Sequence, residues 1–301
     1  ENGRMIVSSS WRGKRYAVLG LARTGVATVR ALVAGGADVT AWDSNADRRE
    51  GIEGATIADL DTIDLAGFDA LVVSPGVPLN THPLAAKARA AGVAITGDIE
   101  LFAEARAELP PHKVVGITGT NGKSTTTALV THILKQAGIP ALMGGNIGLP
   151  ILAQAPLPVG GVYVLELSSY QIDLTHSLDC DVAVLLNLTP DHLDRYDGFA
   201  GYAASKARLF AMQSPVHEAV IGIGDVPSAE IARSLSARAE HLTKIAPGVC
   251  LDQSRWPSLQ GPHNAQNALA AIAVAKALGV DEATIDRALE SFAGLPHRME
   301  K

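Results

Sequence analysis

The sequence predicts an α/β protein with two parallel-sheet domains, and three observations favour this class. Short apolar segments alternate with helical segments along most of the chain, which is typical of a parallel sheet covered by helices. Hydrophobic residues make up 47% of the 301 residues, enough to bury sizeable cores and to exclude a disordered chain. Glycine (29 residues) and proline (16 residues) are frequent and aromatic residues are few (4%), which suits many tight strand-to-helix turns.

The first domain is predicted at residues 5–107 from repeated strand, turn and helix patterns. Its strands are expected at Arg15–Leu19, Asp38–Trp42, Asp69–Val73 and Val93–Thr96. Its helices are expected at Val26–Ala34, Pro83–Ala91 and Ile99–Ala107. The breaker cluster from Glu108 to His112 is interpreted as a linker.

The turn after the first strand, Gly20-Leu-Ala22-Arg23-Thr24-Gly25, resembles a dinucleotide fingerprint and indicates a Rossmann-like domain. The middle glycine of such a turn lets the backbone approach a pyrophosphate, and Ala22 replaces it here, which disfavours NAD. Asp43 follows the second strand, where such domains often bind a ribose hydroxyl. A plain α/β turn without a ligand is the alternative.

The second domain is predicted at residues 112–301, as an α/β unit of the P-loop ATPase type. Its strands are expected at Lys113–Ile117, Val162–Leu167, Val182–Leu188 and Ala219–Ile223. Its helices are expected at Ser124–Gln136, Ala265–Leu278 and Glu282–Phe292.

The strongest motif is Gly116-Ile-Thr-Gly119-Thr-Asn-Gly122-Lys123-Ser124-Thr125, between a predicted strand and helix. Successive backbone N–H groups of such a loop can surround a polyphosphate at the positive end of the helix. Lys123 would bridge terminal phosphate oxygens, and the Ser124 hydroxyl would bind Mg²⁺. A standard P-loop has its first glycine where this chain has Ile117, so the motif is a variant.

Polar residues follow two further strands. Glu166 ends an apolar strand, where a P-loop domain commonly holds Mg²⁺, and His192 lies in the polar run from Thr189 to Arg195. The carboxyl ends of parallel strands share one edge, so both are expected near the P-loop. A solvated turn is the alternative for each residue taken alone.

Gly261-Pro-His263-Asn264-Ala-Gln-Asn267 opens the alanine-rich helix. Asn264 and Asn267 lie three positions apart, so both face one side of the helix and could hydrogen-bond a flat heterocycle. Asn264 could instead be the N-cap of the helix.

Taken together, these residues resemble the Mur ligase family. The matching stretches are Gly97–Phe102, Gly116–Thr125, Gly144–Pro150, Leu165–Gln171, Asn187–Arg195, Lys206, His263–Asn267 and Gly294–Arg298, in family order. The resemblance implies an ATP-dependent ligase of peptidoglycan synthesis that joins D-glutamate to UDP-N-acetylmuramoyl-L-alanine through an acyl phosphate. The P-loop motif and the metal-type residues fit this chemistry, because a carboxylate becomes a good electrophile only when one oxygen can leave as phosphate.

The resemblance also assigns roles to individual residues. ATP would be bound by Gly119, Thr120, Asn121, Gly122, Lys123, Ser124, Thr125, Asn264, Asn267 and Arg298. Ser124 and Glu166 would hold one Mg²⁺, and His192 with a carbamylated Lys206 would serve a second. The muramoyl substrate would contact Arg23, Thr24, Asp43, Gly76, Asn146, Ser168 and His192. Lys123, His192 and Lys206 would be the catalytic residues.

The sequence departs from the family near the uridine site. Besides Ala22, Ser44-Asn45 replaces a Thr-Arg pair that is frequent in relatives, so one cation is missing and Arg48 or Arg49 could substitute. Family members continue into a third domain that binds D-glutamate, and this chain stops at Lys301. We therefore expect the polypeptide as given to bind substrate and nucleotide with little or no turnover, as a monomer.

The charge balance limits the other partners. The chain has 25 Lys and Arg against 31 Asp and Glu, a net charge of −6, whereas nucleic-acid and anionic-membrane binders need a basic face. Two cysteines and no apolar run long enough for a bilayer predict a reduced, cytoplasmic protein. A folylpolyglutamate synthase-like ligase, an NAD dehydrogenase and a nucleotide-binding module without catalysis are the alternatives.

Overall fold

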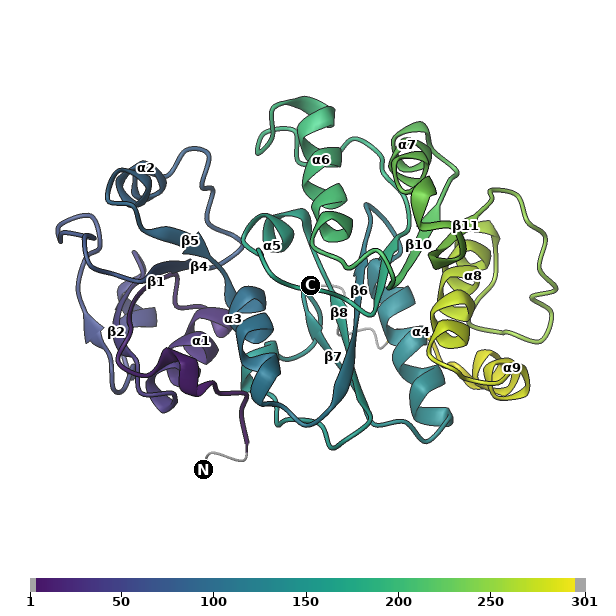
Figure 1. Ribbon diagram of the computed structural model, residues 1–301, viewed down its shortest axis with the longest axis horizontal. Helices are drawn as coiled ribbons and strands as arrows, with labels where there is room; N and C mark the ends of the chain where they lie inside the picture. The colour runs from purple at the N-terminus through teal and green to yellow at the C-terminus, as the bar shows by residue number, and fades with distance from the viewer. Residues whose placement is uncertain (1–3, 296–301) are drawn as a thin grey trace. The chain divides into compact units, whose positions relative to one another are not determined.

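The computed structural model describes residues 4–295, and these residues form two compact units, each built around a parallel sheet (Figure 1). The first unit comprises the chain up to Leu109 together with Leu149–Pro156 and Asp173–Leu178. The second comprises Pro110–Gly148, Leu157–Ile172 and the chain from Asp179 onward. The division is therefore discontinuous in sequence, unlike the continuous domains 5–107 and 112–301 expected from the sequence.

The first unit holds a parallel sheet with strand order β3-β2-β1-β4-β5. Its strands are β1 (Arg15–Leu19), β2 (Asp38–Trp42), β3 (Thr56–Ile57), β4 (Ala70–Val73) and β5 (Ala94–Thr96). Its helices are α1 (Arg23–Ala34), α2 (Pro83–Ala90) and α3 (Asp98–Ala105), with short 3₁₀ turns at Ser9–Trp11, Ala46–Arg49, Arg106–Glu108 and Ile151–Ala153. β4 is buried along its whole length, as expected for an inner strand covered on both faces.

Helix α1 begins at Arg23, three residues before the predicted start, so the second half of the fingerprint turn belongs to the helix. Gly25 lies in its first turn, directly against the carbonyl of Gly20, and a Cβ at Gly25 would overlap that oxygen. The third glycine of the fingerprint thus allows close packing of the helix on β1. Gly25 is therefore required by this close packing and not by its own backbone conformation, because its φ lies outside the left-handed region.

The two inserted segments of the first unit are held by the α3 region. The buried carboxylate of Glu100 accepts hydrogen bonds from the N–H groups of His176 (2.6 Å) and Ser177 (2.8 Å), and from the Ser177 hydroxyl. Thr96 Oγ1 donates to the carbonyl of Leu174 (3.1 Å). The N–H of Ile6 donates to the carbonyl of Leu152 (3.1 Å). These bonds give the Gly97–Phe102 motif a structural role within this unit.

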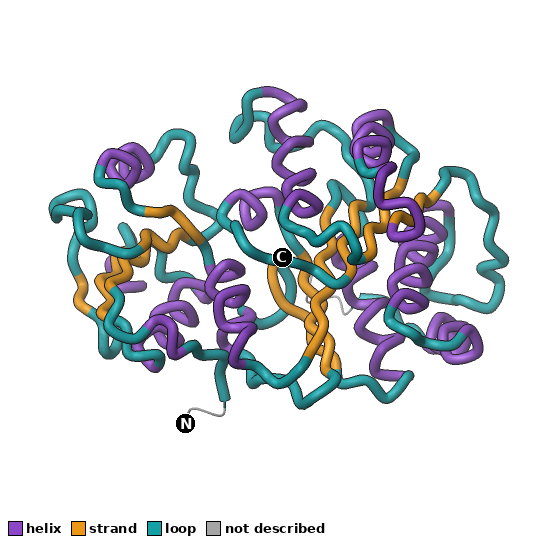
Figure 2. The backbone as a smooth tube through the Cα atoms, viewed as in Figure 1, coloured by secondary structure: helices purple, strands orange, loops and turns teal. Residues whose placement is uncertain are grey.

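The second unit holds a parallel sheet with strand order β11-β10-β9-β6-β8-β7. Figure 2 shows strands in orange and helices in purple along the backbone. Its strands are β6 (His112–Thr118), β7 (Ala141–Gly145), β8 (Gly161–Glu166), β9 (Val182–Leu185), β10 (Glu218–Gly222) and β11 (Leu242–Ile245). Its helices are α4 (Lys123–Gln136), α5 (Ser169–Asp173), α6 (Gly198–Ala211), α7 (Val226–Ser234), α8 (Pro262–Ala277) and α9 (Glu282–Ser291). The last residue of α5, Asp173, already belongs to the first unit.

Helices cover both faces of this second sheet. α4, α8 and α9 pack against one another on one face, and α6 and α7 lie on the other (Figure 1). Valine, leucine, isoleucine and alanine from β6, β9, α4 and α8 form the core under the first group. The expected strand Val182–Leu188 ends at Leu185, which leaves Leu186–Leu188 as a loop at the carboxyl edge. Within residues 4–295, no helix combines the length and apolar character needed to cross a bilayer.

Gly25→Ala should destabilise the first unit strongly, because the added methyl must displace backbone. We expect the free energy of unfolding to fall by about 3 kcal/mol, the upper range for overpacking. The matched control is Gly201→Ala in α6, where the nearest atom to an added Cβ is 3.6 Å away. That variant should be neutral or slightly stabilised, since alanine favours helix. Urea unfolding of both variants tests this; equal behaviour of the two would contradict it.

Asp98, at the start of α3, gives a pH dependence of stability. Burial raises the pKa of Asp98 to about 6, and its side chain is 4% exposed. Because the folded-state pKa lies above the ordinary value, ionisation destabilises the fold, and the unfolding free energy falls as pH rises through about 4 to 6. Between pH 5 and pH 7.5 the free energy of unfolding should fall for the parent. For Asp98→Asn, which has no carboxyl group to ionise at this position, the fall should be smaller by about 1 kcal/mol. Urea unfolding at the two pH values, with exposed Asp286→Asn as control, measures the difference; parallel pH profiles would refute it.

Candidate nucleotide and substrate sites

The P-loop connects β6 to α4 at the carboxyl edge of the second sheet. Gly122 has left-handed backbone geometry (φ +85°) and precedes Lys123, the first residue of α4. A Cβ at Gly122 would overlap the Asn267 side-chain oxygen, so only glycine fits. No side chain among the described residues caps this helix, and its first N–H groups have no acceptor within the helix. The arrangement is a ready anion site.

Lys123 is folded back over the loop. Its Nζ donates to the carbonyls of Gly119 (2.9 Å) and Thr120 (3.1 Å). Burial lowers the pKa of Lys123, and the negative charges of Glu166 and Asp191 oppose that shift. The ammonium therefore lies at the loop where it would meet phosphate oxygens.

Ser124 and Glu166 meet beside the P-loop. Ser124 Oγ donates to Glu166 Oε2 (2.9 Å), and the backbone N–H of Asn146 donates to the Glu166 carbonyl (2.8 Å). Burial raises the pKa of Glu166, while hydrogen bonds from the Ser124 and Asn146 side chains and the charges of Lys123 and Lys206 act in the opposite direction. A hydroxyl and a buried carboxylate next to a phosphate loop are a donor set that suits Mg²⁺, which keeps several waters and phosphate ligands.

No group of three or more His, Cys, Asp or Glu side chains in residues 4–295 is placed to hold a metal ion. Of the metal set expected from the resemblance, the structure brings Ser124 and Glu166 into direct contact, and Lys206 and His192 contact other groups.

Lys206 projects from α6 beneath the P-loop and is 1% exposed. Its Nζ donates to Thr118 Oγ1 (2.9 Å) and to the carbonyl of Gly119 (3.0 Å), and it lies 5.2 Å from the centre of the Tyr202 ring. The amine is thus buried against the strand-to-loop junction. The Tyr202 hydroxyl lies 3.0 Å from Thr120 Oγ1, so the same helix also contacts the loop itself.

His192 lies in an aromatic cluster on the loop after β9. It has a left-handed backbone (φ +51°), uncommon for a residue with a side chain. Its ring centre lies 4.9 Å from that of Tyr170, and its Nε2 lies 3.4 Å from Asp191 Oδ2. The Arg195 guanidinium stacks over Tyr170 at 3.9 Å. The imidazole is 46% exposed and is accessible to a ligand.

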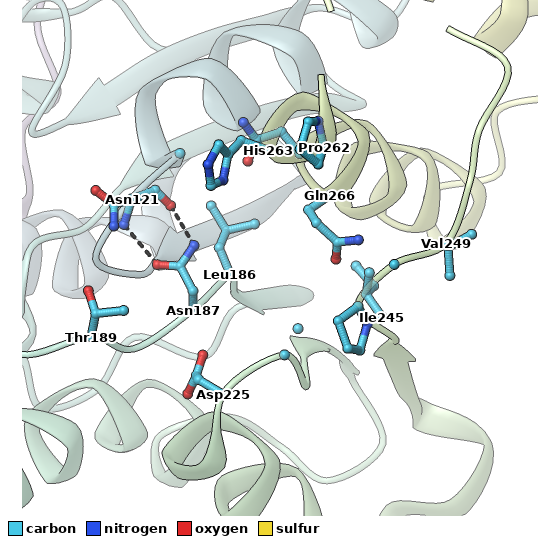
Figure 3. Close-up of a pocket in the computed structure, with 16 residues that line it drawn as sticks. Asn121, Leu186, Asn187, Thr189, Asp225, Ile245, Val249, Pro262, His263 and Gln266 are labelled. Carbon is cyan, nitrogen blue, oxygen red and sulfur yellow. Dashed lines mark hydrogen bonds between the residues drawn. The ribbon is translucent and has the colours of Figure 1, made fainter. Parts of the chain in front are cut away.

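A cavity of about 660 Å³ opens beside the P-loop (Figure 3). Its walls come from the P-loop, the ends of β9, β10 and β11, and the start of α8. The lining residues are Asn121, Gly122, Leu186, Asn187, Thr189, Gly222, Gly224, Asp225, Ile245, Pro247, Gly248, Val249, Pro262, His263, Gln266 and Asn267. Its size and largely apolar walls suit a nucleotide.

The two asparagines of α8 occupy different positions. Asn267 is buried and lines the cavity, and its Nδ2 donates to Asn264 Oδ1 (3.3 Å). Asn264 is in the first turn and its Nδ2 donates to the carbonyl of Gln260 (3.1 Å). The alternative that Asn264 caps the helix is wrong, because α8 begins at Pro262 behind Gly261. Proline already supplies the first helical residue there.

Asn187 is a site residue for which the sequence suggested no role. Its side chain hydrogen-bonds the N–H of Thr120 and lies against Asn121 of the P-loop, the second contact being drawn in Figure 3. The sequence did contain a signal for Asn187, because this residue follows a buried strand whose carboxyl end lies at the sheet edge that carries the P-loop. What the sequence could not show is that β9 pairs directly with β6.

Asp43 fixes the fingerprint turn of the first unit. Its Oδ2 accepts from the N–H of Leu21 (2.7 Å) and its Oδ1 from the N–H of Asn45 (2.8 Å). Burial would raise the pKa of Asp43, but these two hydrogen bonds and the Arg48 guanidinium, 3.6 Å away, outweigh it and lower the pKa. Asp43 is therefore a charged, preorganised group.

An arginine-rich pocket of about 450 Å³ lies beside that turn. Its lining residues are Arg4, Met5, Leu21, Ala22, Arg23, Val26, Ala27, Arg30, Arg48, Leu149, Pro150, Leu152 and Ala153. Of the two candidate replacements for the missing cation, Arg48 lines the pocket, whereas the Arg49 guanidinium stacks on the Trp42 ring at 4.0 Å. Guanidinium groups over apolar walls suit an anion that carries a ring system.

The remaining expected site residues lie in turns and caps. Ser168 and Gln171 form reciprocal hydrogen bonds at the start of α5, as in a capping box. Gly76 is exposed in the turn after β4, and the Thr24 carbonyl accepts from Thr28 Oγ1 (2.9 Å) within α1. Thr125 lies in the first turn of α4. Arg298 lies outside the described residues.

Comparison with known proteins agrees with this geometry. Residues 117–248 match the family model of the Mur ligase middle domain, and residues 14–97 match that of the Mur ligase MurD-like N-terminal domain. The UDP-N-acetylmuramoylalanine–D-glutamate ligase of Novosphingobium aromaticivorans is 66% identical over 300 residues, which cover 99% of this chain and 68% of that protein. The ligase of the same name from Zymomonas mobilis subsp. mobilis is 56% identical over 313 residues, covering 99% of this chain and 70% of that protein.

Solved structures share the fold. The UDP-N-acetylmuramate:L-alanyl-gamma-D-glutamyl-meso-diaminopimelate ligase from Neisseria meningitides aligns with a TM-score of 0.61 at 19% identity, covering 94% of this chain and 99% of that one. The UDP-N-acetylmuramate-alanine ligase MurC from Thermotoga maritima aligns with a TM-score of 0.55 at 22% identity, covering 95% of this chain and 70% of that one. With the family models and the relatives above, these findings show that the chain belongs to the Mur ligase family, and its N-terminal region to the MurD-like group within it.

Proposed function

We propose that the chain serves ATP-dependent addition of D-glutamate to UDP-N-acetylmuramoyl-L-alanine, a step of peptidoglycan synthesis. The single observation that carries the chemistry is the Ser124–Glu166 pair at 2.9 Å beside the P-loop. It supplies a metal-type donor pair next to a phosphate site and the 660 Å³ cavity. The names of the relatives supply the two substrates.

ATP is proposed to lie along the carboxyl edge of the second sheet. Its phosphates would accept hydrogen bonds from the N–H groups at the start of α4 and would meet the Lys123 ammonium. Its adenine would enter the cavity, where the amides of Asn267 and Gln266 offer polar edges and Leu186, Ile245 and Val249 offer apolar ones. Arg298 is proposed as a further ATP contact on the resemblance.

The residues present fit Mg²⁺. Ser124 and Glu166 would hold one ion, which neutralises charge on the phosphates during transfer. Lys206 is the amine that the resemblance implies is carbamylated, and its position beneath Gly119 puts that group at the phosphate loop. A carbamate replaces a buried cation by an anion and, with His192, would serve a second ion.

The chain's own residues would then act on the acyl group. Lys123 would stabilise charge on the γ-phosphoryl group as it passes from ATP to the substrate carboxylate, which becomes an acyl phosphate while ADP leaves. The D-glutamate amine would then attack the acyl carbon, phosphate would leave, and the nitrogen would lose a proton to solvent to give the amide. Asn146, Ser168 and His192 are proposed to contact the muramoyl substrate near this centre.

The first unit is proposed to bind the uridine diphosphate part of the substrate. The pocket beside α1 carries guanidinium groups that match a diphosphate, and Arg23, Thr24 and Gly76 are proposed contacts beside it. Asp43 would hold the turn and offer its remaining lone pairs to the nucleoside. We further propose a monomer that acts in the cytoplasm and has no nucleic-acid partner.

A phosphate-release assay tests the function. In a polypeptide that joins these two units to a D-glutamate-binding domain, release that requires ATP, D-glutamate and UDP-N-acetylmuramoyl-L-alanine together is the expected result. The polypeptide as given should bind ATP and the uridine-linked substrate with little or no release. Release that requires a folate instead would favour the folylpolyglutamate synthase-like alternative. ATP binding without dependence on the uridine-linked substrate would support the binding-module alternative.

Glu166→Gln should weaken the Mg²⁺ dependence of ATP binding. The amide still accepts a hydrogen bond from Ser124 but lacks the charge that attracts the ion. The Mg²⁺ concentration for half-maximal ATP binding should rise roughly tenfold or more. Calorimetric titration at several Mg²⁺ concentrations measures this, with exposed Glu282→Gln on α9 as the matched control. An unchanged Mg²⁺ dependence would remove Glu166 from the metal site.

Arg48→Ala should weaken binding of UDP roughly tenfold, because a charge-assisted hydrogen bond to phosphate is lost. Arg49→Ala is the matched control, since its neighbouring guanidinium stacks on Trp42 and lies outside the pocket lining. Titration of UDP at two salt concentrations should show a smaller salt dependence for Arg48→Ala alone. Equal effects of the two substitutions would argue against Arg48 as the replacing cation.

A further inference from the structure

The P-loop is bound along one side by the loop that follows β9. Asn187 Oδ1 accepts from the N–H of Thr120 (3.1 Å). It also accepts from the N–H of Asn121 (2.8 Å), and Asn187 Nδ2 donates to the Asn121 carbonyl (3.0 Å) (Figure 3). The Asn187 carbonyl also accepts from the Thr120 N–H (3.0 Å). One side chain therefore satisfies three backbone groups of the phosphate loop.

These bonds change which groups remain for a phosphate. A simple Gly-rich cradle would turn all its N–H groups toward the anion, as the sequence suggested. Here the N–H groups of Thr120 and Asn121 point to Asn187. The donors left for phosphate include those at the start of α4, from Lys123 to Thr125, where no side chain of the described residues forms a cap.

The loop that carries Asn187 is itself anchored. The Leu188 N–H donates to Asp225 Oδ2 (2.9 Å), and Asp225 Oδ1 accepts from the Ser228 N–H (2.8 Å) at the start of α7. Thr189 exchanges hydrogen bonds with Thr120 Oγ1 (3.1 and 3.2 Å). Asn187 is thus fixed from its own side and can hold the P-loop in place.

We infer that Asn187 is a positioning residue for the nucleotide: its side-chain amide holds Thr120 and Asn121 so that the donors at the start of α4 face the phosphates. The inference rests on the proposed ATP site. Asn187 lines the same cavity, but its amide is occupied by the loop backbone, so its effect on ATP passes through the loop. The effect should therefore depend on phosphate and not on adenine.

The test compares ATP, ADP and adenosine in calorimetric titrations of the chain with Mg²⁺. Asn187→Ala should raise the Kd of ATP and ADP at least about tenfold and leave the Kd of adenosine within about twofold. Gln136→Ala, an exposed amide at the far end of α4, is the matched control and should change none of the three. Thermal unfolding of each variant reports folding separately.

Asn187→Asp covers the case in which the alanine variant does not fold. Aspartate still accepts from both N–H groups, so the loop keeps those bonds, but it loses the donor to Asn121 and adds a negative charge beside the phosphates. It should fold, and its charge should weaken ATP more than adenosine at low salt. The part of that loss that remains at high salt, where the added charge is screened, reports on the position of the loop. Kd values for ATP within about twofold of the parent in a folded variant, or equal losses for ATP and adenosine, would overturn the inference. Failure of the parent chain to bind ATP would instead overturn the proposed function.

Discussion

The parallel direction of the strands is the constraint on which the second unit depends. Because β6, β8, β9, β10 and β11 run the same way, their carboxyl ends share one edge, and each connection there can contribute to one site. The P-loop, Glu166, Asn187 and Asp225 come from four different strand ends along more than a hundred residues. The central position of β6 between β8 and β9 decides which of them meet: Glu166 reaches Ser124 on one side, and Asn187 reaches Thr120 on the other.

Charges are buried around the P-loop at a cost to stability. Burial lowers the pKa of Lys123 and raises that of Glu166, so each environment disfavours the charged form that phosphate and metal binding require. The mutual attraction of these groups and the hydrogen bond from Ser124 offset part of the penalty. Bound phosphate and Mg²⁺ would offset more of it, because they bring the opposite charges. Perturbed groups of this kind cluster at functional sites for that reason.

In the first unit, a carboxylate that was expected to bind a ligand stabilises a turn of the backbone. Asp43 was expected at a ribose, and its two oxygens are held by the N–H groups of Leu21 and Asn45. This fixes the turn that begins α1 and places Arg48 beside it. Glu100 has the same character, since its carboxylate binds the chain at His176 and Ser177. Neither role can be inferred from a residue type at a strand or helix end.

The sequence by itself determined many of the elements and the chemistry of the strongest motif. Apolar runs placed β1 and β2 at their observed bounds and α4 within one residue, because local periodicity and glycine breaks are properties of neighbouring residues. Short edge strands such as β3 and β11 were not predicted from the sequence, because a strand of two to four residues shows too little alternation of apolar and polar residues. The Lys-Ser pair and Glu166 were identified because their residue types and their position after strands are local signals.

Only the tertiary structure decided the strand order, and with it the contacts that make the site. Strand order made Asn187 a neighbour of the P-loop, sent Lys206 beneath Gly119, and brought Asn267 against Gly122. Packing within the first unit likewise decided that Arg48 lines the pocket beside α1 together with Leu149 and Leu152, which are about a hundred residues away in sequence. The physical reason is that these contacts join residues distant in sequence, whose meeting depends on how whole strands and helices pack and not on any local preference.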